Sequence, residues 1–150
     1  VIIMVEATFI ASGKNMTEAL DFSAALTSKL LFEDTGFTQA GKLDIFCITN
    51  EDANLLDKIL WEKPKYAIIS HNLVNNSSND LVEIGYPGTK FAIGSDSIIN
   101  LSPDLPNNLD TYKNYFQLVI MDNGDLRERA AMTWTKCKNM GLKASFVESI

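Results

Sequence analysis

The sequence predicts an α/β fold of three layers, in which a mostly parallel sheet lies between helices on both of its faces. Short apolar runs typical of strands alternate along the chain with stretches whose apolar residues recur at helical spacing. Such repeated strand–helix units bring strands together in parallel and leave the helices to cover the sheet. No linker interrupts the alternation, and 150 residues is the length of one domain, so we expect a single domain over residues 1–150.

The first half of the chain is expected to contain three strands and two helices. Residues 5–10 are typical of a strand, and the turn after them leads to Asn15, an N-cap residue with Glu18 three positions later in a capping-box pattern. This first helix is expected to end in the segment 34–41, which contains two glycines. The other elements predicted here are a strand over 43–49, a helix that begins with Asn50 as its cap and stops before Pro64, and a strand over 66–70.

The second half is expected to be richer in strands. Residues 72–80 are polar, with several Asn and Ser, and are predicted to form a loop. The elements predicted after it are strands over 81–86, 97–101, 117–121 and 143–148, the last at an edge of the sheet, and helices over 108–115 and 125–140. The last helix carries an apolar stripe that is predicted to face the core, made of Leu126, Ala130, Thr133, Cys137 and Met140.

Composition and charge argue against several classes of protein. The hydrophobic share of 46% and the charged share of 21% are typical of a soluble globular protein. No run approaches the roughly 20 apolar residues that span a bilayer, and the first twelve residues contain Glu6 and lack a basic start, which favours a strand over a signal peptide. The net charge of −6, from 13 basic and 19 acidic residues, does not provide the basic field on which strong direct DNA binding depends.

Cofactor and metal sites are not expected from the motifs. The turn at residues 11–15 has one glycine, and residues 85–90 carry a proline between their two glycines, so neither forms a phosphate-binding loop. Cys47 and Cys137 are predicted to be packed thiols of a reduced, cytosolic protein and not a metal pair. His71 is the only histidine, and it is interpreted either as a residue that fixes the following loop or as a general base. A small nucleotide-binding or hydrolytic domain using a crevice near His71 is therefore kept as the alternative function.

The last helix combines basic residues with a tryptophan. Between residues 125 and 143 five basic residues stand against two acidic ones. At helical spacing, Arg127, Ala131, Trp134 and Lys138 share one stripe. Such a stripe suits an acidic peptide with an aromatic end, and it also suits a solvated face with a half-buried tryptophan. Trp61, at the end of an earlier helix, is likewise interpreted either as a core residue or as an exposed interface anchor.

Several segments resemble the chi subunit family of bacterial DNA polymerase III. Residues 56–64 match the pattern L-D-x-x-L-W-x-x-P, and residues 68–73 follow with a short strand and H-N-L. Residues 82–87 and 99–106 continue the match in the same order, so the resemblance covers most of the chain. It implies a nucleotide-binding-like (Rossmann-like) fold without a nucleotide, and a non-catalytic accessory subunit of the clamp-loader assembly in the bacterial cytoplasm.

The resemblance also implies two partners and their contact residues. One face of such a subunit binds the psi subunit of the clamp loader, and by position this face would include Trp61 and Ile68. A helicase-like protein is an alternative partner for the same face. The other partner is the acidic C-terminal tail of single-stranded-DNA-binding protein, which by position would contact Arg127 and Trp134.

This sequence departs from the family pattern in the tail-binding helix. Ala131 stands where the pattern has an arginine. Arg129 or Lys138 is expected to supply the missing charge, so both are included in the predicted tail site.

Overall fold

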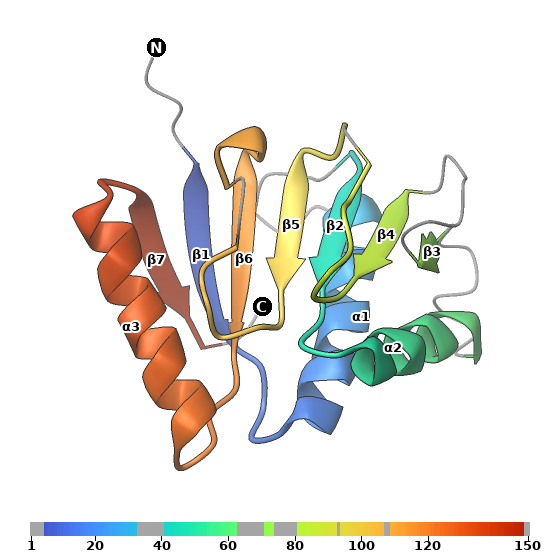
Figure 1. The fold of residues 1–150 in the computed structure, drawn as a ribbon, viewed down its shortest axis with the longest axis horizontal. Helices are drawn as coiled ribbons and strands as arrows, with labels where there is room; N and C mark the ends of the chain where they lie inside the picture. The colour runs from blue at the N-terminus through green and yellow to red at the C-terminus, as the bar shows by residue number, and fades with distance from the viewer. Residues whose placement is uncertain are drawn as a thin grey trace.

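The computed structural model describes residues 5–32, 41–62, 71–73, 81–92, 94–106 and 109–148. Within them seven strands form one sheet in the order β3-β4-β2-β5-β6-β1-β7, with α2 at one end and α3 at the other (Figure 1). Every pair of neighbouring strands runs parallel. The predicted α/β class with a parallel, Rossmann-like sheet is therefore confirmed.

Strands and helices alternate in the first half, and strands dominate the second. In chain order they are β1 (Glu6–Ala11), α1 (Met16–Phe32), β2 (Leu43–Phe46), α2 (Asn50–Glu62), β3 (His71–Leu73), β4 (Val82–Gly85), β5 (Ser97–Asn100), the 3₁₀ turn η2 (Leu109–Thr111), β6 (Asn114–Val119), α3 (Asp125–Asn139) and β7 (Lys143–Val147).

Helices cover both faces of the sheet, as predicted. Alternate residues of β1 show the division, since successive side chains of a strand point to opposite faces. Ile10 belongs to a core shared with α1 and α2, whereas Ala7 and Phe9 belong to a second core beneath α3. Both cysteines are buried within these cores, as expected for packed thiols, and burial raises the pKa of Cys47 to about 12.

The cap of the first helix is confirmed, and the cap of the second lies one residue before the predicted Asn50. The Asn15 side chain accepts a hydrogen bond from the Glu18 N–H (2.9 Å), and the Glu18 carboxylate accepts one from the Lys14 N–H (3.0 Å). At α2 the cap is Thr49 instead of Asn50, because the Thr49 hydroxyl accepts the Asp52 N–H at 3.1 Å.

The prediction of a helix over 108–115 is wrong beyond its first turn. After η2 the chain enters β6, a strand whose six residues are all buried between β5 and β1. The polar residue Asn114 concealed the start of this strand, whereas Gln117 was predicted as the first residue of a strand over 117–121, which overlaps the end of β6. In the structure both residues make hydrogen bonds inside the sheet, for example from the Asn114 amide to the Ser97 hydroxyl at 3.1 Å.

The segment around β3 differs from its prediction as well. Residues 72 and 73, predicted to begin a loop, belong instead to β3 and pair with β4. The strand predicted over 66–70 lies outside the described residues, as do residues 74–80 of the predicted loop.

A buried carboxylate ties two loops to the second face of the sheet. Asp44 of β2 is 1% exposed, and it accepts hydrogen bonds from the Tyr112 hydroxyl (2.6 Å) and the Ser95 hydroxyl (2.7 Å). Burial raises the pKa of Asp44 from 3.8 to about 6, against the opposing effect of the two hydroxyls. The folded protein therefore holds the Asp44 proton more tightly than the unfolded chain does.

We predict that Asp44→Asn removes one component of the pH dependence of stability. In the native protein this group stabilises the fold below about pH 4, and the contribution is lost as the pH rises through about 6. An amide resembles the protonated carboxyl, so the variant should gain roughly 2–3 kcal/mol relative to the native protein between pH 4 and pH 7.5. Urea unfolding of both proteins across this range measures the difference. If the difference in free energy of unfolding between the two proteins were the same at every pH, the raised pKa of Asp44 would be contradicted.

Candidate functional site

The carboxyl edge of the sheet is the place where open α/β folds bind nucleotides. At the turn between β1 and α1, Gly13 has a φ of 99°, and a Cβ placed on it would lie 2.5 Å from the Cβ of Glu18. The Glu18 carboxylate accepts the Lys14 N–H, which is a donor of the kind that a phosphate would use. An anionic side chain therefore already occupies the start of α1.

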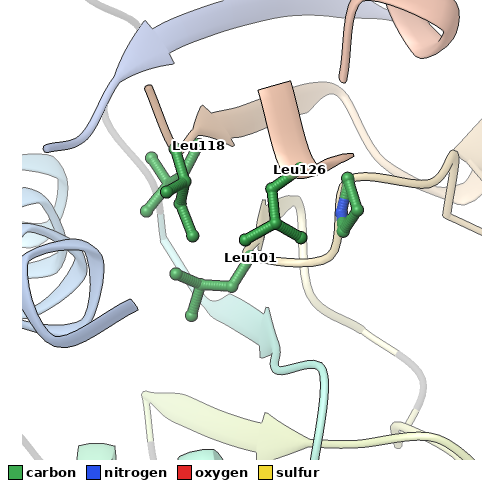
Figure 2. A pocket seen from close by; sticks show the side chains of 5 residues that line it. Leu101, Leu118 and Leu126 are labelled. Carbon is green, nitrogen blue, oxygen red and sulfur yellow. The ribbon is translucent and has the colours of Figure 1, made fainter. Parts of the chain in front are cut away.

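Farther along the same edge, apolar side chains close the space between the sheet and α3. A small hollow there is lined by Leu101, Pro103, Leu118, Ile120 and Leu126 (Figure 2). Leu126 comes from the first turn of α3 and points toward the ends of β5 and β6, where Leu101 and Leu118 lie. None of these five residues has a polar side chain that could bind a ligand. The apolar core therefore reaches the edge of the sheet at this place.

His71 lies at the other edge of the sheet. It pairs in register with Val82, which pairs with Leu43, and each is the first residue of its strand. The imidazole is fully buried, with its Nε2 3.3 Å from a carboxylate oxygen of Asp57 on α2. His71 therefore does not lie in a crevice at the carboxyl edge, where the nucleotide-binding or hydrolytic alternative would need it. Its contact with Asp57 links β3 to α2 instead.

Trp61 is exposed in the last turn of α2. Its side chain is 60% exposed, and its ring lies over His71 with the ring centroids 4.6 Å apart. The interpretation of Trp61 as a core residue is therefore wrong, and the interpretation as an exposed anchor agrees with its position. Leu55 of the same helix is 50% exposed. Ile68 lies outside the described residues.

The buried stripe of α3 largely follows the prediction. Ala130, Thr133 and Cys137 are buried, and Leu126 packs partly buried against the core. Met140 is 57% exposed, contrary to prediction, because α3 ends at Asn139 and the chain turns away toward β7.

Arg129 and Thr133 attach one flank of α3 to the segment that follows β5. The Arg129 guanidinium forms a two-point ion pair with Asp104 and a further ion pair with Asp125 at 3.2 Å. The Thr133 hydroxyl donates a hydrogen bond to the carbonyl of Pro103. Arg129 therefore fixes the position of the helix, with its charge matched by two carboxylates.

Trp134 lies on the other flank of α3. It is half-buried, with its ring packed edge-to-face on Phe9 at a centroid distance of 5.1 Å. The ammonium of Lys138 lies 5.0 Å from the centre of the Trp134 ring, which is a cation–π arrangement. Arg127 and Ala131 are exposed on the same stripe.

The predicted site residues that the structure describes thus lie in three places. Arg127, Trp134 and Lys138 share one flank of α3, whereas Arg129 points to the opposite flank. Trp61 lies near β3, at the far end of the sheet from α3 (Figure 1).

Two residues of interest escaped the sequence analysis. Asp44 was concealed within an apolar run, and Phe146 of β7, 46% exposed, was assigned only to a terminal strand. The sequence alone could not place Phe146, because only the structure shows that Ala144, two residues earlier on the strand, packs against the core beneath α3.

Comparison with known proteins identifies the family. The sequence model of the family described as DNA polymerase III chi subunit, HolC, matches residues 4–145. A search of curated proteins finds no match to the chain. In the part of the chain that the structure describes, no helix has the length and apolar character needed to cross a membrane. The chain belongs to the family of DNA polymerase III chi subunits, accessory subunits of this polymerase in DNA replication.

Proposed function

We propose that this protein is a non-catalytic adaptor of the DNA polymerase III holoenzyme in the bacterial cytoplasm. It joins the clamp loader, through the psi subunit, to the acidic C-terminal tail of single-stranded-DNA-binding protein. The observation that carries the proposal is the pair of aromatic surfaces at opposite ends of the sheet, centred on Trp61 and on Trp134 with Lys138. Two surfaces so far apart can bind two partners at once.

The Trp134 surface suits an acidic tail that ends in phenylalanine. An incoming aromatic ring would pack against the exposed part of Trp134, which Phe9 holds in place from below. Carboxylates of the tail would then meet the ammonium of Lys138 and the guanidinium of Arg127. Since Arg129 is held by Asp104 and Asp125, Lys138 is the better candidate for the charge that Ala131 does not supply.

The Trp61 surface suits a partner that binds through apolar contacts. A tryptophan that is 60% exposed is the kind of anchor that dominates protein–protein interfaces. Asp57 and His71 hold the end of α2 against β3, and the Trp61 ring packs against His71, so the position of the ring is supported from within the protein. Trp61 and Ile68 are proposed to contact psi, with a helicase-like protein as the alternative partner of this surface.

An enzymatic role receives less support from the structure. At the carboxyl edge the Glu18 carboxylate occupies the start of α1, and apolar side chains line the hollow beside α3. His71, the candidate general base, lies at the opposite edge beneath Trp61. No observation therefore favours the nucleotide-binding or hydrolytic alternative over the adaptor.

The first prediction of the proposed function concerns tail binding. A labelled acidic peptide ending in Pro-Phe should bind with an affinity that falls between 50 mM and 300 mM salt, because charges contribute at an exposed site. Trp134→Ala should weaken binding by roughly tenfold or more, as expected for a central aromatic contact. Fluorescence anisotropy measures both effects. Trp61→Ala is the matched control, and equal losses in the two variants would place the site elsewhere.

The second prediction concerns the psi subunit. Trp61→Ala should weaken psi binding by roughly 2 kcal/mol, with little dependence on salt, because the contact is apolar. Isothermal titration calorimetry measures it, with Trp134→Ala as the control that should bind psi normally. Because Trp61 covers His71, Trp61→Phe is included as a variant that keeps a ring over the imidazole. If psi binds Trp61→Ala as tightly as the native protein, this surface belongs to another partner.

A further inference from the structure

We propose that the tail-binding surface continues from α3 onto the edge strand β7, where Phe146 forms a second aromatic wall opposite Trp134. The proposal rests on the proposed function and adds to it a residue and a strand. The ligand it fits is an acidic peptide with an aromatic end, whose ring would lie between the two walls while its carboxylates meet the cations of α3.

The register of the sheet places Phe146 on the face that α3 covers. Phe146 is the partner of Phe9, and two residues earlier Ala144 is the partner of Ala7. Phe9, Ala7 and Ala144 all belong to the core beneath α3. Side chains of paired residues in a parallel sheet point to the same face, so Phe146 lies beside Phe9. Val147, the next residue, packs on the opposite core, as the alternation requires.

The contacts of α3 show which of its flanks adjoins β7. Arg129 and Thr133 reach Asp104 and Pro103 in the segment after β5, toward the middle of the sheet. A rotation of about 100° per residue puts Trp134 and the other residues of its stripe on the opposite flank, toward the end where β7 lies. Trp134 and Phe146 thus flank the same residue, Phe9, from the helix and from the strand.

Exposure indicates that this surface is open. β7 is the last strand of the sheet, and Phe146 remains 46% exposed there although it lies on the helix-covered face. Ala131, which is exposed one turn before Trp134, has only a methyl group with which to cover the surface beside that ring. An exposed aromatic ring on an edge strand favours unwanted association unless a partner uses it.

The charges around the two rings select the partner. Lys138 lies over Trp134, and Arg127 is exposed on the same stripe of α3. Lys143 at the start of β7 is not part of this surface, because alternation along the strand points it to the opposite face, where its ammonium is 3.8 Å from Glu6. Cations on the helix beside an apolar pair fit a peptide that carries carboxylates next to an aromatic side chain.

A double-mutant cycle tests the proposal. The native protein and Phe146→Ala are each titrated with two acidic peptides that differ only in their last residue, Phe or Ala. Phe146→Ala should raise the Kd of the Phe-ended peptide about fivefold to tenfold and leave that of the Ala-ended peptide nearly unchanged. Phe32→Ala is the matched control, because Phe32 is 45% exposed at the end of α1 on the opposite face. It should bind both peptides normally.

The outcomes separate this inference from the proposed function. If Trp134→Ala weakens the Phe-ended peptide while Phe146→Ala does not, the tail site stands and its extension to β7 is overturned. Equal effects of Phe146→Ala on both peptides would also overturn it, because the two rings would then not interact. If the native protein binds neither peptide, both proposals fail. Phe146→Thr, which preserves the strand preference of the position, is measured in parallel and should reproduce the result.

Discussion

The position of α3, and with it the Trp134 surface, depends on a buried pair of amide side chains. Gln117 of β6 and Asn100 of β5 are fully buried, and the Asn100 amide donates to the Gln117 carbonyl at 2.8 Å. Each amide also holds the chain after β5, through the carbonyls of Ser102 (2.7 Å) and Asp104 (2.8 Å). The same segment attaches α3, because it contains the Pro103 carbonyl that Thr133 binds and the Asp104 carboxylate that Arg129 binds. Because an unpaired amide is costly inside a core, this arrangement favours a single orientation of the helix.

The same attachment decides which cations remain for a ligand. Arg129 turns toward Asp104, so its charge is matched inside the protein. Lys138 and Arg127 lie on the other flank, next to the ring that a peptide would meet. One helix thereby performs two tasks, since one flank fixes it to the sheet and the other faces solvent.

The parts of the fold that could be predicted from the sequence are those governed by local pattern. Helical spacing predicted α1, α2 and α3, a capping box predicted the start of α1, and apolar runs marked most strands. The start of β6 was missed, because Asn114 looks like a surface residue until its partner on β5 is known. Asp44 was missed for the same reason, since Ser95 and Tyr112, which satisfy it, lie far away in sequence.

The candidate site divides in the same way. Helical spacing was sufficient to place Arg127, Trp134 and Lys138 together, because all three lie on one helix. Spacing alone could not show that Arg129 would bind Asp104, nor that Trp61 would stand outside the core over His71. Both depend on segments that meet only in the folded chain. The link between Trp134 and Phe146 likewise requires the register of β1 with β7.

The proposed binding of an acidic tail by this acidic protein is physically consistent, because screening makes the interaction local. At physiological ionic strength charges farther apart than about 8 Å are largely screened. The net charge of −6 therefore matters less to a peptide on α3 than the few charges beside Trp134. The acidic groups nearest the start of the helix are Asp122, Asp125 and Glu128, and the first two already have partners within the protein. Asp122 accepts the Gly124 and Arg127 N–H groups, and these bonds lower its pKa, while Asp125 pairs with Arg129. On the proposed function, the overall negative charge would oppose binding to nucleic acid phosphates, and contact with DNA-bound complexes would pass through the protein tail.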